Sequence, residues 1–360
     1  MVNRNSMICK RINLNKYIKI SLVILTILII TVSFIIFDVM NYAGEPAGRE
    51  DVAKFVVIEK GQSFNATLDA LEKAGVIKNP LKFKLFVRIK GYDKKIHAGE
   101  YALSSVMSPA LILDTMLRGK IYLHRITVPE GYNMQQVASV ISGAGFGTVE
   151  NFMKIAADLS FLQEKGIHAR TLEGYLYPDT YYFQKDESCE NIISAMFEKF
   201  QSVFTPEWEK RAKELGLSIH EIITLASIIE KETASQGERL VISSVFHNRL
   251  KRGMRLETDP TVIYGIKNFN GNITRKNLSE TTPYNTYIIT GLPPGPIAGP
   301  GYESIKAALY PAETNYLFFV SKNDGSHIFS ADFKEHNRAV KKYQLGNSTV
   351  SKSCVRINTK

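Results

Sequence analysis

The 360-residue chain has only three cysteines and a single tryptophan. Three cysteines are too few for a disulfide-stapled scaffold, and no Cys-x-x-Cys pair indicates a redox or zinc motif. None of the seven histidines forms an i, i+4 pair around a glutamate, so we predict no metal site and no cofactor. A disulfide between Cys189 and Cys354 stays open, although nothing in the sequence requires it.

The body of the chain lacks a net charge, although the whole chain is basic. The formal charge is +10, from 45 basic and 35 acidic residues. Residues 1–40 hold five bases and one acid, and residues 341–360 hold five bases and no acid. The remaining 35 bases and 34 acids nearly balance, which argues against nucleic acid as a partner.

One long apolar run lies near the N-terminus. Residues 20–37 are 18 uncharged residues, mostly Ile, Leu and Val, and a helix of that length spans roughly 27 Å, close to the hydrocarbon thickness of a bilayer. Five bases precede the run and Asp38 follows it, which predicts a cytoplasmic N-terminus and a body outside the plasma membrane. A cleaved signal peptide is the alternative, but its apolar core is about 7–15 residues and ends at small residues. Residues 38–42 (Asp-Val-Met-Asn-Tyr) are a poor cleavage site.

Composition and periodicity then predict the organisation of the chain. We expect a cytoplasmic segment at 1–19, a single-pass transmembrane anchor at 20–40 and a polar linker at 41–53. Residues 54–120 predict a small β-α-α-β-α unit suited to binding or spacing, and residues 121–345 a larger mixed domain. Residues 346–360 predict a disordered basic tail. The fold class is therefore α+β behind one transmembrane helix.

A helix predicted at 218–233 carries the first chemical signal. It begins at a capping box formed by Ser218 and Glu221, and its apolar stripe is wide enough to be buried. Glu230 and Glu232 lie on opposite shoulders of that stripe. A carboxyl at the edge of a buried face is partly desolvated, so its pKa rises and it can act as a general acid. A solvated helix end is the alternative, and periodicity alone does not choose between the two glutamates.

A loop-rich region at 254–301, with six glycines and six prolines, carries the second signal. A loop of that length in a compact domain is usually functional. Its Tyr, Asn, Thr and Asp side chains suit sugar rings and hydroxyls, and residues 173–181 have the same character. Ordinary structured loops are the alternative.

Five runs together resemble a known family. They are residues 225–233 (Leu-Ala-Ser-Ile-Ile-Glu-Lys-Glu-Thr), 244–250 (Ser-Val-Phe-His-Asn-Arg-Leu), 258–265 (Thr-Asp-Pro-Thr-Val-Ile-Tyr-Gly), 284–287 (Tyr-Asn-Thr-Tyr) and 291–295 (Gly-Leu-Pro-Pro-Gly). In order and spacing they resemble the endolytic murein transglycosylase family (MltG, YceG-like). The resemblance covers the anchor, a LysM-like unit at 54–120 and the body to about residue 344.

The resemblance implies a lytic transglycosylase, a lyase that acts during cell wall synthesis. It would cut the MurNAc–GlcNAc bonds of peptidoglycan strands without water and leave 1,6-anhydroMurNAc ends. Glu232 is the expected catalytic residue because Glu232-Thr233 resembles the Glu-Ser pair of such enzymes, with Glu230 as the fallback. Cell-wall synthases are candidate protein partners. The expected substrate-binding residues are Asn248, Asp259, Tyr284 and Asn285.

Two other functions stay open. A glycoside hydrolase acting on the same polymer would need a second carboxylate, for which Asp259 or Glu257 is available. A non-catalytic scaffold that binds peptidoglycan would need neither.

Overall fold

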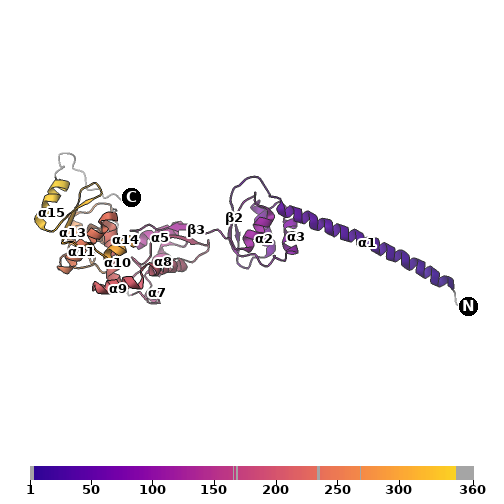
Figure 1. The fold of residues 1–360 in the computed structure, drawn as a ribbon, viewed down its shortest axis with the longest axis horizontal. Coiled ribbons are helices and arrows are strands. Elements are labelled where there is room, and N and C mark those ends of the chain that lie inside the picture. Colours follow the sequence, from indigo (N-terminus) through magenta and orange to yellow (C-terminus); the bar gives the residue numbers. More distant parts are fainter. Residues whose placement is uncertain (1–3, 165, 168, 233–235, 268, 346–360) are drawn as a thin grey trace. The chain divides into compact units, whose positions relative to one another are not determined.

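The computed structural model describes residues 4–345 except 165, 168, 233–235 and 268, with side chains described from Lys16 onward. The predicted tail at 346–360 lies outside the described residues. The chain divides into two compact units, unit 1 (Met1–His124) and unit 2 (Arg125–Lys360) (Figure 1). The break falls four residues after the boundary expected from the sequence.

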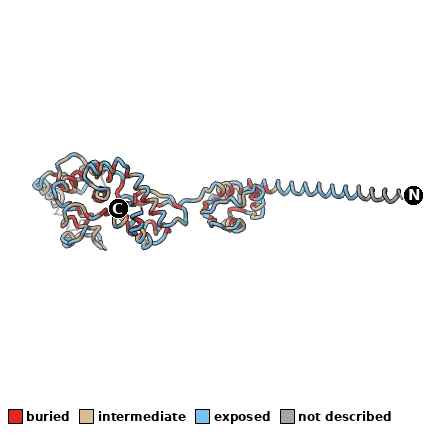
Figure 2. The backbone as a smooth tube through the Cα atoms, turned by 90° about the horizontal axis from the view of Figure 1, so that it is seen from below, coloured by how far each residue is buried: buried red, intermediate tan, exposed pale blue. Residues whose placement is uncertain are grey.

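Unit 1 begins with the 41-residue helix α1 (Arg4–Gly44), which continues beyond the predicted anchor. The side chains of residues 16–37 are exposed, as Figure 2 shows for this part of the helix. Val39, Tyr42 and Ala43 are instead buried in the core of unit 1. The predicted linker at 41–53 is therefore helical over its first four residues, of which Tyr42 and Ala43 pack into that core.

The rest of unit 1 follows the predicted β-α-α-β-α order. β1 (Lys54–Ile58) pairs antiparallel with β2 (Gly99–Leu103), with Val56 opposite Tyr101. Ser63 and Ser108 cap the helices after each strand by accepting backbone N–H bonds. The three helices are α2 (Phe64–Lys73), α3 (Pro80–Ile89) and α4 (Pro109–Leu117).

Unit 2 opens with β3 (His124–Thr127), which forms a two-stranded sheet with β4 (Thr180–Phe183). A capping box formed by Asn133 and Gln136 starts the next helix. The helices of this half are α5 (Met134–Gly143), α6 (Val149–Ala156), α7 (Leu159–Glu164), α8 (Cys189–Val203) and α9 (Pro206–Glu214). Their apolar faces join one core with the helices that follow.

The second half of unit 2 is built around α10 (Ile219–Glu232), which packs along α14 (Tyr302–Leu309). A 3₁₀ turn (Gln236–Glu238) leads into α11 (Arg239–Lys251). An antiparallel hairpin, β5 (Phe318–Ser321) and β6 (His327–Ser330), precedes α15 (Phe333–Val340) and a π-helical turn (Lys341–Leu345). The α+β class is confirmed: the described residues are mostly helical, with small two-stranded sheets.

The region predicted as loop at 254–301 contains two short helices, α12 (Asp259–Gly265) and α13 (Arg275–Ser279). Pro260 lies in the first turn of α12, where a missing N–H costs no hydrogen bond. Proline therefore starts a helix here instead of interrupting one. This helix places the residues around Thr258 beside the end of α10.

Candidate active site

Helix α10 carries both candidate carboxyls at its C-terminal end. Its start is fixed by the predicted capping box, in which the Ser218 N–H donates to Glu221 and the Glu221 N–H donates to Ser218 Oγ. Residues 222–229 are all buried. A helix buried on all sides at its centre holds its last turn rigidly, so the directions of Glu230 and Glu232 are well defined.

Glu230 is tied into the surrounding structure. Its side chain is only 7% exposed and forms an ion pair with Arg239 at 3.3 Å. Its second oxygen accepts the backbone N–H of Gly301 at 3.0 Å. Glu230 thus joins α10 to the first residue of α11 and to the residue that precedes α14.

Glu232 has a different environment. It is partly exposed, and its carboxylate accepts a hydrogen bond from the Thr258 hydroxyl. The pKa of Glu232 is raised to about 7, mainly by burial; the nearby charge of Asp259 also raises it, whereas the Thr258 hydrogen bond and Arg249 lower it. A carboxyl with this pKa exchanges a proton near neutral pH. Thr233, the neighbour that suggested the catalytic role, lies outside the described residues.

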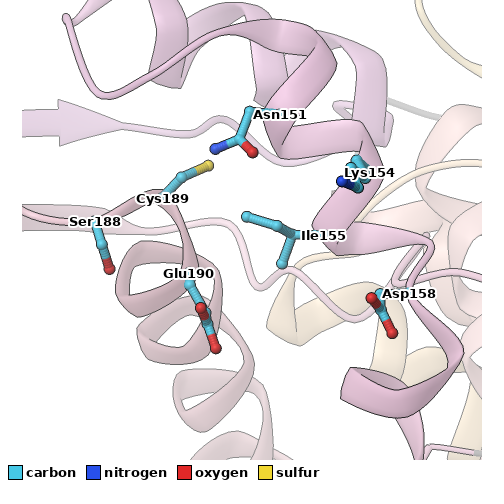
Figure 3. Close-up of a pocket in the computed structure, with 7 residues that line it drawn as sticks. All are labelled: Asn151, Lys154, Ile155, Asp158, Ser188, Cys189 and Glu190. Atoms are coloured by element: carbon cyan, nitrogen blue, oxygen red, sulfur yellow. The ribbon is translucent and has the colours of Figure 1, made fainter.

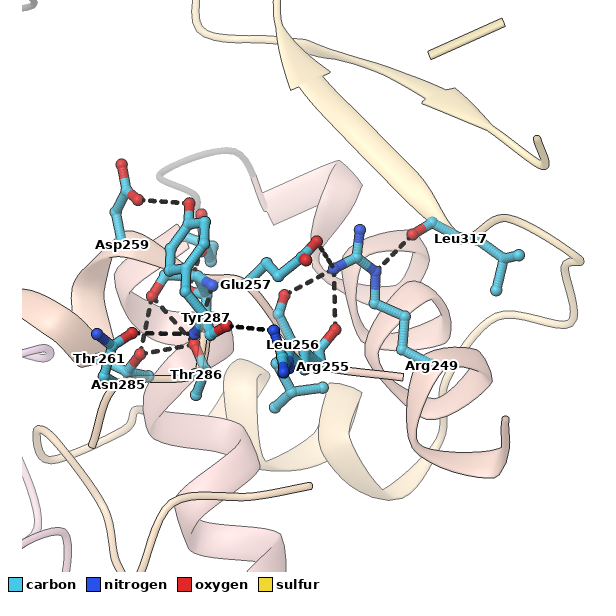
Figure 4. A network of polar contacts seen from close by, with 12 residues as sticks. Arg249, Arg255, Leu256, Glu257, Asp259, Thr261, Asn285, Thr286, Tyr287 and Leu317 are labelled. Carbon is cyan, nitrogen blue, oxygen red and sulfur yellow. Dashed lines mark hydrogen bonds and ion pairs between the residues drawn. The ribbon is translucent and has the colours of Figure 1, made fainter. Parts of the chain in front are cut away.

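Thr258 is held by the loop at 285–287, whose residues Asn285, Thr286 and Tyr287 are drawn in Figure 4. Its N–H donates to Thr286 Oγ1 at 3.0 Å, and its carbonyl accepts the Thr261 hydroxyl at 2.8 Å. The Tyr287 hydroxyl donates to Asp259 at 2.7 Å. Two loops that are far apart in sequence are thereby joined directly beside Glu232.

Arg249 of α11 supports the other side of this network. Its guanidinium donates to Glu257 at 3.1 Å, to the Leu256 carbonyl at 2.9 Å and to the Leu317 carbonyl at 2.6 Å. Glu257 has a φ of +50°, in the left-handed region that non-glycine residues rarely occupy. This turn brings the chain from Glu257 into Thr258, and the ion pair with Arg249 stabilises it.

Two of the expected substrate-binding residues are engaged in holding backbone. The Asn248 amide donates to the carbonyls of Thr314 and Tyr316 at 2.9 and 3.0 Å. The Asn285 side chain is fully buried, and its amide donates to the carbonyls of Asn277, Leu278 and Glu280. Asp259 lies next to Glu232, as described above. The substrate-binding roles of all four candidates stay predictions.

Tyr284, the fourth candidate, packs against Tyr264 of α12 with ring centroids 4.8 Å apart. The Tyr264 hydroxyl donates to Glu173 at 3.0 Å, and Glu173 also accepts the backbone N–H of Met134. Burial raises the pKa of Glu173 to about 7. The sequence showed Glu173 only as part of a polar run, because the partners that bury it lie on distant segments.

Two cavities of unit 2 are lined by other residues. One, of about 500 Å³, is walled by aromatic residues of α8 and by Tyr175 and His220. The other, of about 350 Å³, lies where α6 meets α8, and in Figure 3 Asn151 and Cys189 point toward one another across it. Cys189 is a free thiol whose pKa is raised by burial. Its expected partner Cys354 lies outside the described residues. No group of three or more His, Cys, Asp and Glu that could hold a metal occurs in the described part of the chain.

A carboxyl of raised pKa at the end of a buried helix, within a helical α+β domain, has the features of an acid–base enzyme. The chain belongs to the YceG-like family, whose model matches residues 56–342. A Bacillus subtilis protein named endolytic murein transglycosylase is 37% identical over 79% of this chain and 83% of its own length. A Streptococcus pneumoniae protein of the same name is 28% identical over 86% of this chain, which spans 64% of that protein.

A solved structure agrees with this assignment. The crystal structure of a YceG-like protein from Listeria monocytogenes is similar with a TM-score of 0.56 and 34% identity. The similarity covers 80% of this chain and 99% of that one.

Proposed function

We propose that the chain is a membrane-anchored endolytic peptidoglycan lytic transglycosylase with Glu232 as its catalytic residue. The observation that carries the proposal is the setting of Glu232: partly exposed, beside Thr258 and Asp259, with a pKa raised to about 7. Glu230, two residues earlier, already accepts two hydrogen bonds from Arg239 and Gly301. The two relatives named endolytic murein transglycosylase support the substrate.

The reaction requires one carboxyl that gives and then takes a proton. Protonated Glu232 donates its proton to the oxygen between MurNAc and GlcNAc as the bond from C1 to that oxygen breaks, so the GlcNAc portion leaves as an alcohol. The C6 hydroxyl oxygen of the same MurNAc then bonds to C1 and releases its proton to the Glu232 carboxylate. The product is a 1,6-anhydro ring, no water is consumed, and the carboxyl returns to its starting state.

The anchor is supported by the structure of α1. Residues Lys16–Gly44 form one apolar helix whose membrane-length stretch buries no side chain within the protein. Cleavage a few residues past the apolar stretch, beyond Ala43, would remove Val39, Tyr42 and Ala43 from the core of unit 1, which favours an uncleaved anchor over a signal peptide. Positive charge before the helix supports a catalytic unit outside, facing peptidoglycan.

A two-carboxylate hydrolase is the second candidate, and the charge of Asp259 near Glu232 favours it over a scaffold. Glu257 fits the second role less well because its carboxylate is paired with Arg249. Hydrolysis would produce reducing ends, whereas the proposed reaction produces anhydro ends.

The deciding experiment digests purified sacculi with the wild type, Glu232→Gln and Glu230→Gln, and identifies strand ends by mass spectrometry. We expect anhydro ends from the wild type and from Glu230→Gln, and a loss of about 10²- to 10⁴-fold in Glu232→Gln. Reducing ends would support the hydrolase instead. Full cutting by a folded Glu232→Gln protein would show that Glu232 is not the catalytic residue.

A further inference from the structure

Helix α3 packs directly against the outer end of α1, within unit 1. Phe83, Phe86 and Val87 form its buried side. On a neighbouring side, Lys82 Nζ lies 2.8 Å from the Asp38 carboxylate of α1. Asp38 is the first residue after the uncharged run at 20–37. The contact between the two helices therefore begins where the apolar part of α1 ends.

The side of α3 away from the core exposes a stripe of large apolar side chains. Leu81, Leu85 and Ile89 are 73%, 44% and 48% exposed, and residues spaced by four lie above one another on a helix. Residues 78–92 also hold five bases and no acid; the bases are Lys78, Lys82, Lys84, Arg88 and Lys90. An apolar stripe beside basic residues is the pattern of a helix that lies in a membrane interface.

The position of α3 relative to the bilayer follows from the length of the apolar part of α1. When residues 20–37 fill the hydrocarbon layer, Asp38 is about 1.5 Å beyond it along the helix axis. The headgroup layer on each side of a bilayer is roughly 5–7 Å thick, so the Lys82–Asp38 pair lies within that layer. In Figure 1, α3 is beside the outer end of α1, whereas α2 and β2 lie farther from the N-terminus. Within unit 1, α3 is thus placed at the level of the lipid headgroups.

We infer that α3 is a lipid-docking helix: Leu81, Leu85 and Ile89 enter the outer surface of the bilayer, and the bases beside them bind anionic headgroups. The inference rests on the proposed membrane anchor. Lipid is the occupant that the geometry favours, because α3 packs against α1 where the membrane-spanning stretch ends and the charge of α3 is complementary to anionic lipid. Docking would hold unit 1 against the membrane as well as tether it.

Site-directed fluorescence on the full chain tests the docking. The chain, with Cys9→Ser, Cys189→Ala and Cys354→Ser, receives one new cysteine by Leu85→Cys, Asp69→Cys or Thr26→Cys, and each is labelled with an environment-sensitive dye. The proteins are reconstituted in vesicles of phosphatidylcholine with phosphatidylglycerol. Asp69 is the matched control, because it is exposed on α2 of the same unit, and Thr26 lies within the apolar run of α1. Nitroxide lipids quench dye in the bilayer, and iodide quenches dye in water.

We expect nitroxide quenching at Leu85 and Thr26, and iodide quenching at Asp69. Replacing phosphatidylglycerol by phosphatidylcholine should reduce the quenching at Leu85, and so should the double change Lys84→Gln and Arg88→Gln. Iodide quenching at Leu85 with Thr26 still in lipid would overturn the docking and leave the anchor intact. Iodide quenching at Thr26 would overturn both. If the dye at Leu85 is shielded from both quenchers, protein covers the stripe, and the inference is overturned. If the dye at Asp69 is quenched by nitroxide lipid as strongly as the dye at Leu85, α3 is not the docking face, and the inference is overturned as well.

Discussion

The Thr258 hydroxyl donates its hydrogen bond to the carboxylate of Glu232, joining the residue before α12 to the end of α10. This bond favours the charged form of Glu232, whereas burial favours the neutral form. The pKa of about 7 is the balance of these two effects and the smaller ones of Asp259 and Arg249. Substitutions that remove one of these effects should shift the pKa of Glu232 in a known direction.

Thr258→Val should raise the pKa of Glu232, because it removes the hydrogen bond that stabilises the carboxylate. If Glu232 is the general acid, the alkaline limb of the activity profile should move up by about one to two pH units, since a hydrogen bond to a charged group contributes about 1.5–3 kcal/mol. Initial rates on sacculi across pH 5–9 measure this. Thr261→Val is the control, because its hydroxyl bonds to the Thr258 carbonyl. An identical shift in both variants would contradict the prediction.

Asp259→Asn should move the same limb in the opposite direction. The charge of Asp259 raises the pKa of Glu232, so its removal should lower that pKa while an amide oxygen still accepts the bond from Tyr287. A transglycosylase would keep cutting, with its alkaline limb at lower pH. A hydrolase that used Asp259 as its second carboxylate would lose about 10²- to 10⁴-fold. Rates measured across the pH profile of Asp259→Asn therefore separate the two mechanisms: a transglycosylase keeps its activity with a shifted limb, and a hydrolase loses it.

The raised pKa of Glu232 also predicts how stability depends on pH. An unfolded glutamate titrates near 4.5 and the folded one near 7, so between these values the folded state binds more protons and the free energy of unfolding falls as pH rises. Glutamine does not titrate, so in Glu232→Gln the decrease in the free energy of unfolding between these pH values should be smaller by up to about 3 kcal/mol. Glu173, with a pKa also near 7, should maintain part of the slope.

Urea unfolding of the wild type and Glu232→Gln at pH 5 and pH 8 gives the comparison. The free energy of unfolding of Glu232→Gln, relative to that of the wild type, should increase as pH rises. A difference between variant and wild type that stays constant with pH would show that Glu232 titrates normally.

Glu230→Gln should destabilise the fold. The change leaves Arg239, whose side chain is 9% exposed, without its anionic partner. Breaking a buried ion pair from one side costs about 3 kcal/mol. Thermal unfolding should show a lower Tm, while anhydro ends still form at a temperature where the variant is folded. A Glu230→Gln protein with wild-type Tm and no cutting would transfer the catalytic role to Glu230.

Asn285→Ala tests whether a predicted substrate-binding residue acts through structure. Its buried amide holds three carbonyls of residues 277–280, and leaving them without a donor should lower the free energy of unfolding by about 1–3 kcal/mol. We expect a lower Tm and little change in KM once the protein is folded. A raised KM at unchanged Tm would instead place Asn285 on the substrate.

Local signals in the sequence predicted much of this architecture. Ser218 and Glu221 form the capping box that was expected at the start of α10, because such a box depends on residues three positions apart. The start of α12 was missed, since Pro260 was interpreted as a loop residue rather than as a first-turn residue. Capping and first-turn rules predict where a helix begins, but they concern only residues within about one helical turn of that point.

The site itself depends on distant contacts. Thr258 is 26 positions from the carboxylate it contacts, and Asn285 interacts with backbone that no side-chain pattern reveals. Periodicity placed Glu230 and Glu232 on opposite shoulders of one helix, but only their partners distinguish them. Arg239 and Gly301 hold the first, and Thr258 contacts the second.

Helix α1 has no break between its exposed stretch and Val39, Tyr42 and Ala43, which belong to the core of unit 1. Because the end of this continuous helix is packed into the core of unit 1, a change in the direction of the helix also turns unit 1. If lipid surrounds the exposed stretch, the tilt of α1 in the bilayer fixes the inclination of unit 1 to the membrane normal. A change in membrane thickness, which changes helix tilt, would then change the inclination of unit 1 without altering any contact inside that unit.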